Sequence, residues 1–295
     1  TGFKNCNKCK VKKVKCNECT KPKIMPCPTC KKAFADCGCN KMDNEKKGRV
    51  DNSGTFAGFV LLSDASWDKE QLINDLKEKW DIEVVEDKDK NDDALVLSID
   101  NMLVAVSLMP APIPNNEAEH NAANNYMWPE AVNTAKTHKA HIMVAVLGKD
   151  IDLLERGKLY TKFVAACCRQ KNAIGVYTSG TVFETCFYED LAEMMKEDEL
   201  PIFNWIWFGL YRSKNRVCCY TYGMDVFGKD EMEVLDADAE PSELRDFLAS
   251  LVSYVLEYDV ILNDGETIGF SEDDKHVITR SEGVSLPGIT LKIEF

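Results

Sequence analysis

Apolar residues recur along residues 55–295 in two spacings, and each spacing predicts one kind of element. Alternating or short continuous apolar runs predict strands, whereas apolar residues three and four positions apart predict helices. The predicted strands are 56–63, 82–86, 94–99, 102–108, 141–148, 173–178, 205–210, 217–227, 231–237, 260–262, 265–270 and 289–295. The predicted helices are one that follows Ser66 and ends near Trp80, then 117–137, 151–169, 187–196 and 241–257.

Local signals support several of these elements. Ser66 is a residue type that caps helices, and an apolar stripe of Leu72, Ile73, Leu76 and Trp80 follows it at helical spacing. Asp100 and Asn101 form a dipeptide compatible with a hairpin between two strands. The order of elements predicts an α+β fold with mixed, largely antiparallel sheets. Two βαβ-like units, one in each half of 55–295, suggest a pair of ferredoxin-like halves.

Cysteine dominates the first 42 residues, which are otherwise poor in apolar side chains. Eight of the chain's 13 cysteines lie there, at Cys6, Cys9, Cys16, Cys19, Cys27, Cys30, Cys37 and Cys39. Such a segment cannot bury enough apolar surface to offset its chain entropy, so it needs another source of stability. Four closely spaced thiolate pairs predict two structural zinc ions in a small zinc-ribbon or knuckle-like module, and each structural site can contribute about 10–16 kcal/mol.

The pairing of the knuckles stays open. Interleaved pairing of 6/9 with 27/30 and of 16/19 with 37/39 places seventeen residues between the halves of each site, a separation typical of zinc sites. Sequential and nested pairings remain alternatives. A disulfide framework is the competing interpretation, but the lone Cys186 and the vicinal pairs 167–168 and 218–219 favour a reducing, cytoplasmic setting.

Charge is segregated between this module and the rest of the chain. The first 42 residues carry 11 of the 36 basic residues and 2 of the 49 acidic ones, which leaves 25 against 47, or −22, for the remainder. Lys10, Lys12, Lys13 and Lys15 could neutralise phosphates. With this basic loop, six of the cysteines resemble the fungal six-cysteine binuclear zinc cluster, which binds DNA: Cys6, Cys9, Cys16, Cys27, Cys30 and Cys37. Cys19 and Cys39 are surplus to that pattern, and no aromatic residues for base stacking accompany the lysines.

The polar segment 43–54, with Gly48 and Gly54, predicts a linker. The expected organisation is therefore a two-zinc module at 1–42, a linker at 43–54 and an α+β domain at 55–295. No window approaches the eighteen apolar residues of a membrane span, so none is predicted.

The α+β part resembles a bacterial family. The stretches 102–114 (MLVAVSLMPAPIP), 124–131 (NNYMWPEA), 138–141 (HKAH), 175–183 (GVYTSGTVF), 204–211 (NWIWFGLY) and 264–270 (DGETIGF) are similar to the domain of unknown function 4261 over about residues 55–295. The resemblance implies an α+β domain and supplies no activity. The cysteine module lies outside it.

Candidates for a catalytic pocket are few. On the predicted helix 117–137, His120, Asn124 and Trp128 recur every fourth position on one face, and Glu117 precedes them. His141, with His138 three residues before it, is a further candidate. A structural role is favoured, because a histidine near the C-terminus of a helix offsets the helix dipole. We find no nucleophile elbow, dinucleotide fingerprint or carboxylate pair.

Together these patterns favour a binding protein over an enzyme. The expected function is protein recognition by an acidic α+β domain that carries a structural zinc module. An enzyme with a pocket near His120, Asn124 and Trp128 is one alternative, and nucleic-acid binding through the lysine-rich module is another. No membrane partner is expected.

The cysteine pattern makes a direct prediction about metal. Purified protein should contain about two equivalents of zinc, and a chelator should unfold residues 1–42 while residues 55–295 stay folded, because the module has little core without metal. Elemental analysis and circular dichroism with and without chelator measure this. Four disulfides and no metal would contradict it.

Overall fold

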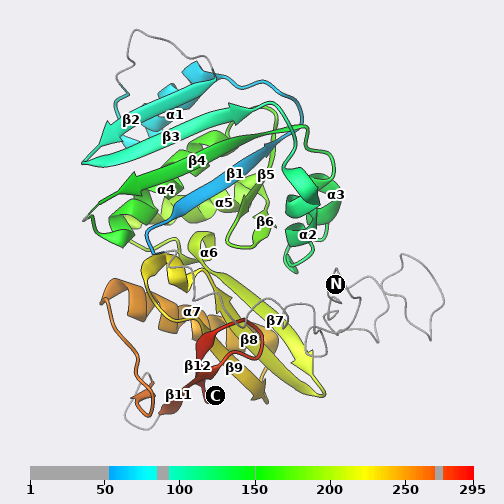
Figure 1. Ribbon diagram of the computed structural model, residues 1–295, viewed down its shortest axis with the longest axis vertical. Helices are drawn as coiled ribbons and strands as arrows, with labels where there is room; N and C mark the ends of the chain where they lie inside the picture. Colours follow the sequence, from blue (N-terminus) through cyan, green and yellow to red (C-terminus); the bar gives the residue numbers. More distant parts are fainter. Residues whose placement is uncertain (1–52, 85–92, 150, 270–274) are drawn as a thin grey trace, which may run out of the picture.

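The computed structural model describes residues 53–84, 93–149, 151–269 and 275–295 (Figure 1). They form helices and two six-stranded sheets, which confirms the α+β class. The cysteine module and most of the linker lie outside the described residues. No helix in the described parts is long and apolar enough to cross a membrane.

The first sheet is antiparallel throughout and has the order β2-β3-β4-β1-β5-β6. Within it, β3-β4-β1-β5 with helices α1 and α4 has the strand order of a ferredoxin-like unit, extended by β2 and β6 at the two edges. Its strands are β1 (Phe56–Leu62), β2 (Ala94–Ile99), β3 (Met102–Met109), β4 (Ala140–Gly148), β5 (Ala173–Thr178) and β6 (Thr181–Phe183).

Helices α1 (Lys69–Trp80) and α4 (Leu153–Cys168) cover one face of this sheet. Asp68 caps α1, because its Oδ1 accepts the Gln71 N–H at 2.9 Å. The prediction that Ser66 caps this helix is wrong, because the Ser66 hydroxyl donates to Asp64 instead. The buried side chains of Leu72 and Leu76 show that the predicted stripe faces the core.

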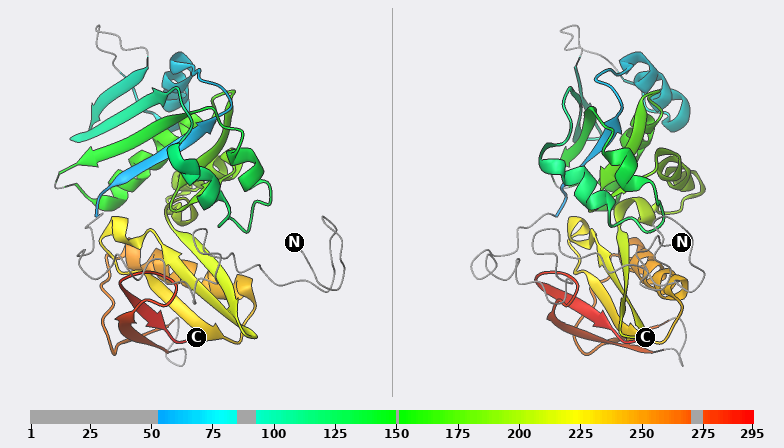
Figure 2. Two further views of the ribbon diagram at one scale, coloured as in Figure 1. Left: turned by 45° about the vertical axis from the view of Figure 1, so that its right-hand side comes forward. Right: turned by 90° about the vertical axis from the view of Figure 1, so that its right-hand side faces the viewer.

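The opposite face of the first sheet carries a shorter cover. Helices α2 (Glu117–Ala122) and α3 (Ala131–Ala135) pack on β5 and β6, with a 3₁₀ turn, η2 (Pro114–Asn116), before them. In Figure 1 they lie at one end of the sheet, and β2, β3 and β4 have no helix in front of them. The right-hand view of Figure 2 shows the sheet from the side, with α1 and α4 on the face opposite to α2 and α3.

The second sheet has the order β10-β11-β12-β9-β8-β7, and β12 runs parallel to β9 beside it. Its one long helix, α7 (Pro241–Glu257), packs on β7 and β8. This sheet therefore does not repeat the ferredoxin-like unit, and the expected pair of such halves is wrong for it. Its strands are β7 (Trp207–Ser213), β8 (Arg216–Tyr222), β9 (Met232–Ala237), β10 (Thr267–Ile268), β11 (His276–Glu282) and β12 (Ile289–Ile293).

Two segments that were predicted as strands instead cap the ends of α1 and α7. Asp81 and Asp259 have positive φ, and the next residues turn back to donate N–H groups, from Ile82 to Leu76 O and from Val260 to Val255 O. This is how a helix satisfies its last carbonyls while an apolar residue covers its end. Residues 82–84 and 260–262 are thus capping segments rather than strands.

Short helical segments replace the ends of other predicted strands. Residue 205 belongs to α6 (Ile202–Trp205), and the strand predicted for 217–227 ends at Tyr222 before η4 (Met224–Phe227). The sequence patterns did not predict strands β6 and β11. The remaining helical elements are α5 (Thr185–Glu193) and η3 (Met194–Glu197).

Aromatic residues join the two sheets into one core. Phe227 lies 5.3 Å from Phe56 and 5.1 Å from Trp205 between ring centroids, and the Trp205 indole N–H donates to Thr161 Oγ1 at 2.7 Å. Gly223 is required here, since its φ is +122° and a Cβ would lie 2.5 Å from the Trp205 carbonyl oxygen. The two sheets should therefore unfold together.

This closed core predicts that the α+β part folds without the cysteine module. A fragment of residues 53–295 should be soluble and should unfold in one cooperative transition, because its apolar faces are buried against one another. Thermal denaturation followed by near-ultraviolet and far-ultraviolet circular dichroism tests this. A molten fragment, or two separate transitions, would contradict it.

Candidate functional site

The eight predicted metal-ligating cysteines lie outside the described residues. Within the described ranges, no group of three or more His, Cys, Asp or Glu side chains is arranged to hold a metal ion. The described cysteines are free thiols; Cys186 is exposed and the vicinal pairs are buried. Burial raises the pKa of the Cys167 thiol well above its usual range, so this residue is a core side chain.

The predicted helix over 117–137 is wrong, and this separates the candidate pocket residues. Helix α2 ends at Ala122 because Asn125 captures the chain: its Oδ1 accepts the N–H groups of Met127 and Trp128, and its Nδ2 donates to Val182 O at 2.8 Å. The i, i+4, i+8 relation of His120, Asn124 and Trp128 is therefore lost.

The five pocket candidates occupy different surroundings. His120 is exposed, whereas Trp128 is half-buried against the small core beneath α2 and α3. Asn124 donates its Nδ2 to Gly180 O at 2.9 Å, across the β5–β6 turn. Glu117 contacts β5 and His141 contacts the proline-rich loop, so no convergent catalytic arrangement joins the five.

Glu117 belongs to a small polar cluster with Tyr177 on β5. The Tyr177 hydroxyl donates to Glu117 Oε1 at 2.6 Å and accepts from Asn121 Nδ2 at 3.0 Å. Burial, followed by the bond to the Glu117 carboxylate, raises the pKa of Tyr177, so its hydroxyl stays protonated at neutral pH. The cluster can donate and accept hydrogen bonds, and its observed contacts hold α2 on the sheet.

His138 and His141 anchor the proline-rich loop before α2. His138 Nε2 accepts the Ile113 N–H at 2.8 Å, while its Nδ1 faces Ala135 O and lies 3.8 Å from Glu119 Oε1. His141 Nδ1 lies 2.9 Å from Ala111 O, and burial lowers the pKa of this imidazole. Both histidines therefore fix a loop.

Two buried carboxyl groups belong to the second sheet, Glu231 directly before β9 and Glu233 within it. Their pKa values are shifted in opposite directions. Burial raises the pKa of Glu231 to about 7, although the Thr221 hydroxyl and the N–H groups of Gly223 and Met224 donate to it. Glu233 has the reverse balance. Burial alone would raise its pKa, but the hydrogen bonds from the chain around Val284 and from Lys292 outweigh burial and lower it.

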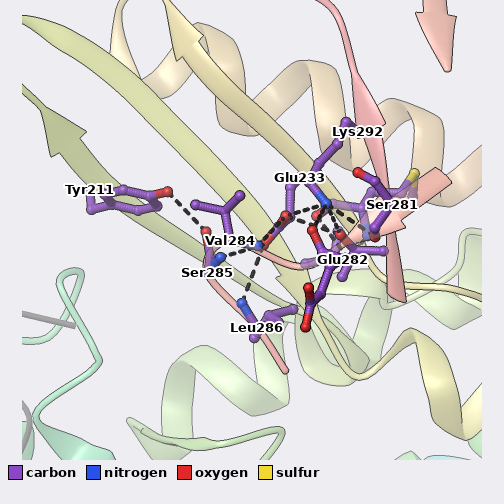
Figure 3. A network of polar contacts seen from close by, with 11 residues as sticks. Tyr211, Glu233, Ser281, Glu282, Val284, Ser285, Leu286 and Lys292 are labelled. Carbon is purple, nitrogen blue, oxygen red and sulfur yellow. Dashed lines mark hydrogen bonds and ion pairs between the residues drawn. The ribbon is translucent and has the colours of Figure 1, made fainter. Parts of the chain in front are cut away.

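Figure 3 shows the surroundings of Glu233. The N–H groups of Val284, Ser285 and Leu286 point to its carboxylate, at 3.0, 2.6 and 3.2 Å in their shortest contacts. Lys292 Nζ lies 3.0 Å from Oε2. A carboxylate satisfied on every side by its own chain is a clamp that fixes the β11–β12 hairpin on β9, not a vacant ligand site.

The open part of the first sheet is a surface that the sequence reasoning missed. The outward positions of β2, β3, β4 and the start of β1 carry no Asp, Glu, Lys or Arg. In register, Val96 lies beside Ala105, Ala105 beside Ala145, and Ala145 beside Ala57. The row next to it pairs Leu103 with Leu147.

We call these residues, together with Ala94, Ser98, Ser107 and Met143, the open face. Val96, Leu103 and Leu147 are 61%, 45% and 51% exposed. From strand and residue spacings, the open face spans roughly 15 Å across the strands and roughly 14 Å along them. An antiparallel sheet with a solvated face normally alternates apolar and polar residues, and these strands do not.

The Glu233 clamp generates a prediction for stability. Glu233→Gln should destabilise the protein by about 3 kcal/mol at neutral pH, because it leaves Lys292 and the loop N–H groups without their buried carboxylate. The lowered pKa means that this stabilisation is present above pH 4.5, the ordinary value, and is lost as the pH falls through the folded-state pKa. Urea denaturation at several pH values measures both effects.

The matched control is Glu282→Gln, which removes an exposed carboxylate on β11, two strands from β9 in the same sheet. It should change stability by no more than about 0.5 kcal/mol. Equal losses for the two variants would show that Glu233 does not clamp the hairpin.

Comparison with known proteins supports part of the expected family resemblance. Residues 220–294 match the family model of a domain of unknown function, DUF4261. This range runs from the end of β8 to β12 and includes Glu231, Glu233 and the clamp loop. No curated protein and no solved structure matches the chain.

Proposed function

We propose that the chain is a binding protein whose α+β part docks another protein on the open face of its first sheet. The observation that carries the proposal is the uncharged and mainly apolar surface formed by β2, β3 and β4, which no helix of the described ranges covers. Contiguous apolar patches of this kind mark interaction sites in folded proteins.

The charge distribution strengthens this interpretation. Residues 43–295 hold 25 basic and 47 acidic residues, yet none of these 72 lies at the outward positions of the open face. A flat apolar surface free of charge can pack against a second apolar surface without burying unpaired charge. The partner should therefore present an apolar sheet or helix face.

The same reasoning ranks catalysis below binding. Glu117, His120, Asn124, Trp128 and His141 have separate contacts, and the buried carboxylate of Glu233 is satisfied by its own chain. Nucleic-acid binding through the lysine-rich residues 8–23 remains a prediction from the sequence.

Zinc is proposed for the cysteine module. Cys6, Cys9, Cys16, Cys19, Cys27, Cys30, Cys37 and Cys39 would hold two structural ions in a ribbon or knuckle-like unit, on the basis of their spacing. We further propose that the resemblance to DUF4261 extends from residues 220–294 to residues 55–219, as the motifs at 102–114 and 175–183 indicate. We also propose that the protein acts in the cytoplasm.

Photo-crosslinking tests the docking surface. A photoreactive phenylalanine analogue replaces Leu103 in the full chain, which is expressed in cells that naturally make the protein. We expect a discrete heterologous adduct from position 103 and none from the same analogue at Tyr258, an exposed side chain of the other sheet's helix end (69% exposed). Mass spectrometry identifies the adduct.

The variant Leu147→Glu tests whether the adduct depends on docking at the open face. Residue 147 lies directly beside Leu103, and a carboxylate there must be desolvated on docking. It should reduce the adduct yield at least about tenfold, the factor expected for 1.4 kcal/mol. The matched control, Lys149→Glu, changes charge at an exposed position beyond the end of β4 and should preserve the adduct. Equal adducts from positions 103 and 258, or none from 103, would contradict the proposal.

A further inference from the structure

Among the described residues, strand β2 is an edge strand without the usual protection. It ends the first sheet, pairs with β3 in continuous register from Ala94 to Ile99, and contains neither a charged residue nor a proline. Native edge strands normally carry a charge, a proline, a bulge or a cover that prevents pairing with another chain. At the other edge of the sheet, β6 is a buried strand of three residues that packs against α2.

The hairpin fixes which backbone groups of β2 face outward. Ile99 and Met102 flank the two-residue turn, and the Leu108 N–H donates to Asp93 O at 2.8 Å. In an antiparallel pair, hydrogen-bonded positions alternate, so the odd-numbered residues from 93 to 99 bond to β3. The N–H and C=O groups of Ala94, Val96 and Ser98 therefore point away from the sheet. They offer three donors and three acceptors in one row.

The sequence of β2 has an approximate two-fold symmetry about Val96. Leu95 and Leu97 flank it, and the small residues Ala94 and Ser98 lie beyond them. A two-fold interface requires a surface that is complementary to itself. An antiparallel partner strand centred on Val96 would set Val96 opposite Val96, Ala94 opposite Ser98, and Leu95 opposite Leu97.

We propose that a second copy of this chain occupies this edge, with the two β2 strands antiparallel and centred on Val96. All three outward donors and all three outward acceptors of each strand are then paired, and the two six-stranded sheets become one of twelve strands. The pairing goes beyond the proposed function, because it uses the backbone edge of β2, whereas the other protein docks on the open face.

The side chains near the edge suit this partner. Leu97 and Ile99 are half-buried on the inner face, and Val96 is largely exposed on the outer one. All three gain cover from the second strand. The two open faces also become continuous across the two-fold axis, which doubles the surface offered to a docking protein.

Sedimentation analysis of the full chain tests the proposal. The wild type should be a dimer. Val96→Lys and Val96→Glu should each weaken it at least about tenfold, because like charges then lie directly opposite each other. An equimolar mixture of the two variants should restore a heterodimer through a Lys–Glu pair. Val96→Thr, which keeps the β-branched side chain, should stay dimeric.

Two further variants separate pairing through the β2 edge from misfolding and from self-association through the open face. Ala94→Pro removes one outward N–H while it leaves the bonds to β3 intact, so it should weaken the dimer even if the charged variants fold poorly. Leu147→Glu lies two strands from the edge and should leave the dimer unchanged while it lowers the yield of the crosslinked adduct. A monomeric wild type, a dimeric Val96→Lys, no heterodimer on mixing, or loss of the dimer in Leu147→Glu or Val96→Thr would overturn the proposal.

Discussion

A β-sheet that is apolar on both faces needs a cover on both faces, because apolar surface left in water forfeits roughly 25 cal/mol per Å². In the first sheet, α1 and α4 supply a full cover on one side. On the other side, the two short helices α2 and α3 pack on β5, β6 and the end of β1. The length of α2 therefore decides how much of the sheet stays open, and Asn125 sets that length by capturing the chain after Ala122.

Several polar contacts of the α+β part hold the connections between its elements in place. His138 and His141 hold the proline-rich loop, Tyr177 and Glu117 hold α2, and Glu233 holds the β11–β12 hairpin. Each of these polar groups thus fixes a connection between elements. This leaves the open face, which lacks charge, as the surface of the described molecule that most requires an occupant.

Local sequence signals predicted most elements well. Helix α7 and strands β2 and β5 have the predicted bounds, because their apolar periodicity is long or their turn residues are clear. The failures have identifiable causes. The strand expected at 82–86, which is described as far as residue 84, and the strand expected at 260–262 give way to apolar capping residues after positive-φ aspartates. The helix expected at 117–137 is interrupted by an asparagine whose partner, Val182, lies far away in the sequence.

The open face was hidden from sequence reasoning for a different reason. The runs 94–99, 102–109 and 140–148 are apolar at both alternating sets of positions, which normally indicates a strand buried on both sides. Whether a helix covers the second side depends on where distant elements pack. The metal prediction, by contrast, rests on cysteine spacing alone and lies in residues 1–42, outside the described part of the chain.

Radical footprinting of the open face, inside cells and on dilute purified protein, tests most directly whether another protein covers it. We predict that Leu103, Met143 and Leu147 are labelled in the purified protein and protected in the cell, while Tyr258 and Ile261, exposed beyond the second sheet, are labelled equally in both. Equal labelling of Leu103, Met143 and Leu147 in the two settings would mean that no protein covers this face, and would contradict docking there.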